Sequence, residues 1–184
     1  EARIRAQNEA TFSQFNRAIR ARVSVYQNQF ADALTALAAS FVNTAAPLQF
    51  GVYMSFGTQA GDLTNPLAID PQNGENFVHP SIETGAQLQA DGVSLDQRFL
   101  DKAVRRPSQS ADNLTADLGW TRYSTPTSPV PIIKNEELIL LRAEANIGLG
   151  NFGAAVPDID LVRTTSGGLL PYAGPLISRR FSPS

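Results

Sequence analysis

The amino-acid sequence predicts a mainly α protein in which two helical hairpins are separated by a long, loop-rich insertion with minor β structure. Three observations predict this fold class. Apolar residues recur at helical spacing near both ends of the chain, a short turn divides each of these regions in two, and glycine and proline are dense across the middle. The 184 residues are expected to form one domain, or a fragment of one, divided as follows: residues 11–42 the first hairpin, 43–130 the insertion, 131–170 the second hairpin and 171–184 an irregular tail.

The composition excludes several classes of function. The net charge is −2 and the sequence contains no basic cluster, which argues against nucleic acid as a partner. The absence of cysteine excludes disulfides, thiolate catalysis and cysteine-based zinc sites, and no cofactor is expected. No apolar run approaches the 18 or more residues typical of a membrane span.

The first hairpin is predicted from two apolar stripes on either side of Asn28. Asn28 interrupts the periodicity, and we expect it to cap the second helix at its N-terminus. Because the connection is short, the two helices should be antiparallel neighbours. The stripes consist of Phe12, Phe15, Ile19 and Tyr26, then Phe30, Ala33, Leu34, Leu37 and Phe41.

The insertion is predicted to be mostly ordered loop, since its glycines and prolines leave no long period intact. Tyr53, Phe56, Leu63, Leu67, Ile69 and Phe77 supply apolar anchors for it. The expected regular elements are a short strand at residues 50–56, a short helix at 96–106 and a short strand at 119–123, with polar loop over 107–114.

The second hairpin is predicted from a helix over residues 135–148 and a Gly-containing turn. Asn151 is expected to cap a fourth helix that runs to about Thr164. Pro157 falls inside that helix and should bend or shorten it, because proline lacks the backbone N–H.

The two hairpins are related by a repeat with an offset of 122 residues (143 − 21). Each unit has a small residue in its first helix, a tight turn, and an aromatic residue that opens the second helix, as in a tetratricopeptide-type hairpin. Two such units do not make a stable array, so they must pack on each other or on the loops between them. The matched pairs are Arg20 with Arg142, Ala21 with Ala143, Val25 with Ile147, Phe30 with Phe152, Ala33 with Ala155, and Leu37 with Ile159.

At the residue level the chain resembles the SusD/RagB family of glycan-binding lipoproteins, most strongly from Pro131 to Leu170. The resemblance implies a SusD-like α–α superhelix of tetratricopeptide-like hairpins. The segments that carry it are Pro131, Arg142-Ala143-Glu144-Ala145, Gly148 to Asn151, Asp160-Leu161-Val162-Arg163, Gly167-Gly168-Leu169 and, earlier, Leu95-Asp96-Gln97-Arg98. The family's lipidation signal and closing helix are missing, so we expect a fragment, or a coding sequence that leaves its native frame near Leu170.

By this resemblance the protein would bind an oligosaccharide or other nutrient at the surface of the bacterial outer membrane. It would deliver this ligand to a SusC-type TonB-dependent transporter without breaking a bond, and it would be attached to the membrane only through a lipid anchor absent from this chain. The alternative hypothesis is a tetratricopeptide-like protein–protein interaction module or scaffold.

The candidate ligand-binding residues are Trp120, Arg122, Tyr123 and Tyr53. Sugar rings present apolar C–H faces that stack on aromatic planes, while polar neighbours bind the hydroxyl groups. The competing interpretation is that these aromatic residues anchor loops to the helices. The lone histidine, His79, is expected to be a locally bonded loop residue, and no catalytic or metal-binding constellation is predicted.

Overall fold

The computed structural model describes residues 8–111 and 113–174, and the chain divides into two compact units. The described parts of the first, here the helical unit, are residues 8–53, 131–165 and 170–174. The second, the strand unit, consists of residues 54–130 and 166–169. Each unit is described by itself.

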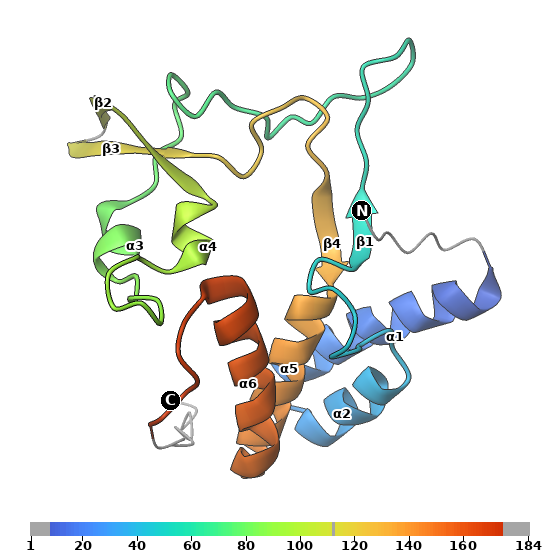
Figure 1. Cartoon of the computed structure of the whole chain (residues 1–184). Helices are drawn as coiled ribbons and strands as arrows, with labels where there is room; N and C mark the ends of the chain where they lie inside the picture. The colour runs from blue at the N-terminus through green and yellow to red at the C-terminus, as the bar shows by residue number, and fades with distance from the viewer. Residues whose placement is uncertain (1–7, 112, 175–184) are drawn as a thin grey trace. The chain divides into compact units, whose positions relative to one another are not determined.

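The described residues form six helices and four strands, labelled in Figure 1. The helices are α1 (Glu9–Tyr26), α2 (Phe30–Ala38), α3 (Pro80–Thr84), α4 (Gln97–Leu100), α5 (Asn135–Gly148) and α6 (Phe152–Gly167). The strands are β1 (Gly51–Met54), β2 (Ala103–Ala111), β3 (Leu114–Trp120) and β4 (Val130–Lys134), paired as β1 with β4 and β2 with β3.

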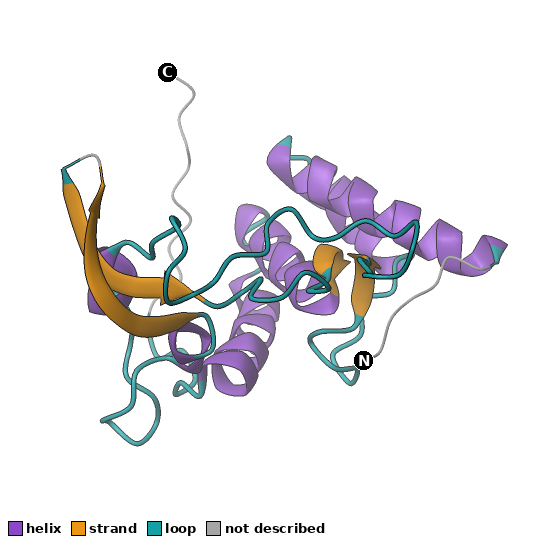
Figure 2. Cartoon of the chain, turned by 90° about the horizontal axis from the view of Figure 1, so that it is seen from above, coloured by secondary structure: helices purple, strands orange, loops and turns teal. Residues whose placement is uncertain are grey.

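The prediction of a mainly α superhelix is wrong, because the chain mixes helices with two small antiparallel sheets. The error lies in the segment that forms the β2–β3 ribbon. The sequence predicts helix as far as Arg106 and polar loop over 107–114, whereas residues 103–111 form β2 and β3 begins at Leu114. The long paired strands are visible in Figure 2. Pro107 is tolerated there because the register shifts between Arg105 and Gln109, and such irregularities accept a residue without an N–H. The sequence of β2 is polar because a two-stranded ribbon buries little of its surface.

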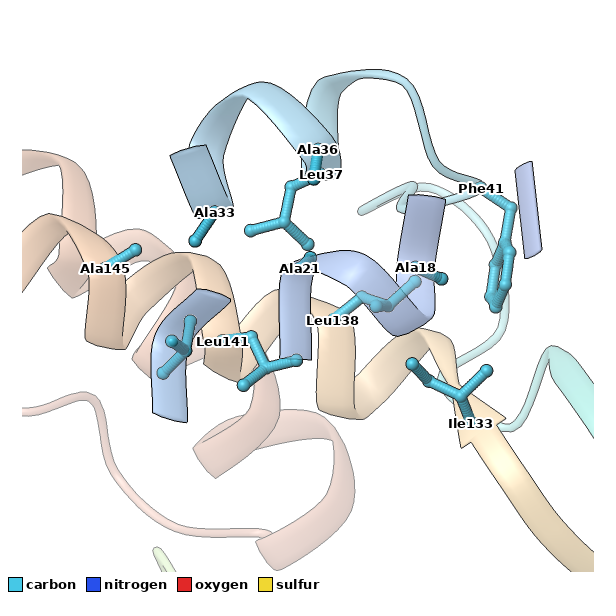
Figure 3. Packing of buried hydrophobic residues seen from close by; sticks show 11 residues of the cluster. Ala18, Ala21, Ala33, Ala36, Leu37, Phe41, Ile133, Leu138, Leu141 and Ala145 are labelled. Atoms are coloured by element: carbon cyan, nitrogen blue, oxygen red, sulfur yellow. The ribbon is translucent and has the colours of Figure 1, made fainter. Parts of the chain in front are cut away.

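The core of the helical unit lies between α1, α2 and α5. Figure 3 shows small side chains from all three helices meeting there, with Leu37, Leu138 and Leu141 filling the space between them. Alanine at the contact lets the helix axes approach closely. Gly148 extends this close approach, since a Cβ at Gly148 would overlap the ring of Phe30 at the start of α2.

Two details of the hairpins differ from the prediction. Asn28 does not cap α2; it lies just after α1 with a φ of 57°, and α2 begins after Gln29. Helix α6 runs from Phe152 through Pro157 to Gly167, so it ends beyond the predicted end at about Thr164 and the proline does not shorten its first part. The four long helices themselves lie where the sequence predicts them.

A buried ion pair joins α5 to α6. Arg142 donates from Nε and Nη2 to the two carboxylate oxygens of Asp158, at 2.7 and 2.6 Å. Asp158 is only 4% exposed, and the hydrogen bonds to its carboxylate hold the pKa of Arg142 above its ordinary value.

The motif Asp160 to Arg163 in α6 makes hydrogen bonds to the segment that follows the helix. Arg163 donates to the Leu170 carbonyl, and Asp160 accepts from the N–H of Tyr172.

The side chain of Asn135 fixes the point where β4 becomes α5. It is fully buried, accepts a hydrogen bond from the N–H of Asn43 and donates one to the carbonyl of the same residue, at 2.9 and 2.7 Å. These bonds satisfy backbone groups that would otherwise be buried without partners. Beside it, Gly51 of β1 lies so close to Ile133 of β4 that a Cβ would meet the backbone of Ile133.

The strand unit adds a third segment to the β2–β3 ribbon. Phe77 forms an isolated antiparallel bridge with Gly119, and the N–H of Val78 donates to the carbonyl of Leu118 at 3.0 Å. Residues 77–78 therefore pair along the edge of β3 that β2 leaves open. In the part of the chain that the structure describes, no helix is both long and apolar enough to cross a membrane.

Candidate ligand-binding site

Trp120 is the last residue of strand β3, and it lines two cavities of the strand unit. The larger cavity has a volume of about 760 Å³, and the smaller has about 350 Å³. Both volumes fall in the range of ligand pockets, which run from roughly 300 to 1,000 Å³.

The larger cavity is mostly apolar with a few polar groups at its walls, which is the usual composition of a small-molecule site. It lies at the surface, because His79, Leu114 and Ile82 are exposed. Its lining residues are Glu75, Asn76, Phe77, Val78, His79, Pro80, Ile82, Leu114, Thr115, Ala116 and Trp120.

Local structure explains how residues 77–82 form one wall of the larger cavity. Bonding to β3 fixes Phe77 and Val78, and the chain then turns into α3 at Pro80. His79 is the N-cap of this short helix: its Nδ1 accepts the N–H of Ser81 at 3.1 Å and lies 2.8 Å from the Ser81 hydroxyl. The prediction of a locally bonded loop histidine is confirmed, although the residue also lines the cavity.

Behind this wall, the guanidinium of Arg106 lies over the ring of Phe77, 4.9 Å from its centroid. Phe77 pairs with Gly119 on the edge of β3 opposite β2, and the side chain of Arg106 on β2 passes beside the same glycine. A Cβ at Gly119 would meet the Pro71 carbonyl and approach the Arg106 side chain, so glycine is required for this crossing. Arg106 thus packs against the ring of Phe77 and supports this part of the cavity wall.

Arg106 is also the least satisfied polar group of the strand unit. It is 6% exposed, and its Nη2 donates to Gln109, but its Nε and Nη1 are buried with no hydrogen-bond partner among the described residues. A buried donor without a partner loses its hydrogen bonds to water, so the burial of this arginine destabilises the folded strand unit.

The smaller cavity contains more charge than the larger one. At its base the carboxylate of Asp96 accepts hydrogen bonds from Nε of Arg98 at 2.9 Å and from the backbone N–H of the same residue at 2.9 Å. Burial alone would raise the pKa of Asp96, but the bonds from Arg98 outweigh it and hold this pKa below its ordinary value. The lining residues are Ile82, Ala86, Asp96, Arg98, Phe99, Lys102, Ala103 and Trp120.

Of the four residues proposed from sequence, Trp120 lines both of these cavities. Arg122 and Tyr123 follow it in the chain and pair with each other, with the guanidinium 5.7 Å from the ring centroid. Neither lines a described cavity. Tyr53 belongs to the helical unit, where its hydroxyl donates to the carbonyl of Gln49. Tyr53 thus belongs to a different unit from the other three residues.

Sequence reasoning missed Ile82, Phe99 and Lys102 as cavity residues. They come from short helices and turns whose position depends on the β2–β3 ribbon, which the sequence did not predict. Phe77, which the sequence predicts as an apolar anchor of the insertion, also lines the larger cavity. Among the residues described, no group of three or more histidine, aspartate or glutamate side chains is arranged to hold a metal ion.

The chain matches no protein-family model and no curated protein. The function of the site must therefore be inferred from its geometry and from the sequence.

Proposed function

We propose that the strand unit binds an oligosaccharide at the larger cavity, without chemical conversion, and that the indole of Trp120 is the surface on which a sugar ring stacks. The observation that carries this proposal is the position of Trp120 in the wall of a cavity of about 760 Å³ with polar groups around it. An indole offers a large apolar plane together with one N–H donor, which suits a ligand whose faces are apolar and whose edges are polar.

The rest of the lining fits the same ligand class. Asn76, Thr115 and Glu75 supply hydrogen-bonding groups for hydroxyls, while Phe77 supplies a second aromatic wall. The guanidinium of Arg106 over the ring of Phe77 fixes that ring before any ligand arrives, and preorganised walls lower the entropic cost of binding.

The resemblance to SusD/RagB proteins extends the proposal to a biological setting. In that setting the protein captures a glycan at the bacterial outer-membrane surface and passes it to a TonB-dependent transporter. This part of the proposal rests on the sequence motifs alone. Copurification with a transporter of that type from outer membranes tests it separately from ligand binding.

Intrinsic fluorescence tests the binding directly, because Trp120 is the only tryptophan in the chain. Titration with a panel of neutral and charged oligosaccharides should change its emission and protect it from acrylamide quenching for at least one glycan. Native gels that contain the same glycans should show retardation. If no glycan changes the emission or the migration, the proposal is wrong.

A variant and a matched control locate the site. Trp120→Ala should abolish retardation by the glycan that binds, since the stacking surface is lost. Tyr26→Ala removes an aromatic residue that is 73% exposed on α1 in the helical unit, and it should leave retardation unchanged. Circular dichroism of both variants checks that each remains folded.

A further inference from the structure

Trp120 and Ile82 each line both cavities of the strand unit, so the two cavities share a wall. A ligand longer than one cavity can contact both by crossing these two side chains. Because Trp120 closes its strand and is only half-buried, its indole is available to such a ligand. The shared wall makes the cavities neighbouring subsites for one extended molecule.

The two cavities differ in charge. Glu75 is the carboxylate that lines the larger cavity, whereas Arg98, Lys102 and Asp96 line the smaller one. The lining of the smaller cavity thus carries one more positive charge than negative. An anionic group is therefore favoured on that side of Trp120 and disfavoured on the other.

Hydrogen bonds hold one cation of the smaller cavity, Arg98, in place before a ligand binds. The carboxylate of Asp96 fixes Arg98 through Nε and through the backbone N–H, and it is also close enough to Lys102 for the ammonium group to lower its pKa. Phe99 and Ala103 supply apolar surface beside these charges. An apolar face next to a preorganised cation matches a sugar ring that carries a carboxylate.

We propose that the site takes an acidic oligosaccharide, with a neutral sugar in the larger cavity and a uronic-acid residue in the smaller one, its carboxylate bound by Lys102. This inference rests on the proposed function and names its substrate class. The neutral sugar would stack on one part of the Trp120 surface while the acidic sugar crosses to the side of Phe99.

A matched pair of ligands tests the inference on the full chain. One is a xylo-oligosaccharide that bears glucuronic acid, and the other is the same molecule with its carboxyl group reduced to an alcohol. Titrations followed by Trp120 emission should give about tenfold tighter binding for the acid, as expected for one charge-assisted hydrogen bond at a partly exposed site. The preference should decline as salt is added, because salt screens the charge pair.

Substitution of Lys102 tests whether this residue causes the preference for the acidic ligand. Lys102→Gln should reduce binding of the acid to that of the reduced ligand, and Lys102→Arg should retain most of the preference. Arg105→Gln is the control, since Arg105 is an exposed cation of the same unit whose partners Glu83 and Asp117 line neither cavity. It should leave the preference intact.

The outcomes separate the two proposals. If both ligands bind equally to the unmodified chain and Lys102→Gln changes neither, the acidic-sugar inference is overturned while the proposed function stands. If neither ligand changes Trp120 emission and no glycan of the panel does, the proposed function fails and the inference fails with it. Equal weakening of both ligands by Lys102→Gln indicates a structural role for the lysine and also overturns the inference.

Discussion

Asn28 and Gly150 occupy the same position in the two helix–helix turns of the helical unit. Both have a left-handed backbone, with φ of 57° and 78°, and each follows the C-cap residue of the first helix of its hairpin. Their separation, 150 − 28 = 122 residues, equals the offset of the sequence repeat. The repeat therefore extends to the backbone conformation of the turns.

The hydrogen bonds of the two turns are also equivalent. In each, the N–H of the left-handed residue bonds three residues back and the next N–H bonds five back, which is a Schellman motif. The N···O distances are 2.9 Å for Asn28 to Val25, 2.8 Å for Gln29 to Ser24, 3.0 Å for Gly150 to Ile147 and 2.8 Å for Asn151 to Asn146. Both second helices then begin at a phenylalanine, Phe30 and Phe152.

The left-handed turn predicts the effect of Gly150→Ala. No atom lies within 4 Å of a Cβ at this position, so the cost is the backbone conformation alone, about 1 kcal/mol of unfolding free energy. Thermal unfolding followed by circular dichroism, which reports mainly on helices, measures it. In the equivalent turn, Asn28→Gly should stabilise by about 0.5 kcal/mol for the same reason.

Gly153 provides the control for this prediction. It lies in the first turn of α6 with helical backbone, and a Cβ there would also meet no atom within 4 Å. Gly153→Ala should therefore stabilise the chain by up to about 1 kcal/mol, since alanine is the better helix former. If the alanine substitutions at residues 150 and 153 shift stability in the same direction, the conformational argument is wrong.

The Arg142–Asp158 pair predicts a large loss for Arg142→Met. The substitution leaves a carboxylate that is 4% exposed without its partner, which should cost about 3 kcal/mol in denaturant unfolding. The double variant Arg142→Met with Asp158→Leu should recover much of this loss. For comparison, Arg105→Met breaks only exposed pairs with Glu83 and Asp117 and should cost less than about 1 kcal/mol.

Asp96 predicts an acid-dependent loss of stability in the strand unit. Because its pKa in the folded chain lies below the ordinary value of 3.8, its contribution is fully present above that value and is lost as the pH falls through the lower folded pKa. Unfolding followed by Trp120 emission from about pH 5 down to about pH 2 should show this decline, and Asp96→Asn should flatten it. An unchanged pH profile in the variant contradicts the assignment.

Two other carboxylates contribute less to this profile. Hydrogen bonds from Asn73 and Ser94 lower the pKa values of Asp70 and Asp91, but both side chains are exposed to solvent. Substitution of either by asparagine should leave most of the pH dependence in place.

The unsatisfied donors of Arg106 predict that Arg106→Met does not destabilise the strand unit. Methionine keeps apolar contact with Phe77 and removes a buried cation whose Nε and Nη1 lack partners. We expect stability to be unchanged or to rise by about 1 kcal/mol, because the lost cation–π contact and the bond to Gln109 offset part of the gain. Arg106→Ala, which also leaves a void, should instead lose about 2 kcal/mol. Trp120 emission during urea unfolding distinguishes the two.

The helices of this chain were predictable because their signals are local. The stripe from Phe30 to Phe41 and the run from Asn135 to Gly148 repeat over several turns, and burial in the observed core follows that period. The left-handed residue at Asn28 was mistaken for an N-cap because asparagine favours both positions.

The β2–β3 ribbon was not predictable in the same way. Its strands hold Pro107, two serines and one threonine and little apolar alternation, so nothing local favours a strand over a loop. What holds the ribbon is nonlocal pairing, including that of Val78 with Leu118. The cavities depend on this ribbon, which is why Trp120 was identified as a candidate while Ile82 and Lys102 were not.

The pairing of β1 with β4 brings Gly51 and Ile133 together within the helical unit, although they are far apart in the sequence. The backbone thus leaves this unit and resumes it at nearly the same place. A change in the length of the intervening segment alters mainly the entropic cost of bringing its two ends together. This cost rises by about 0.6 kcal/mol for each doubling of the segment's length. The hairpins are consequently compatible with intervening segments of very different size, so in evolution or in engineering the strand unit, and with it the proposed ligand site, can be exchanged independently of the helical core.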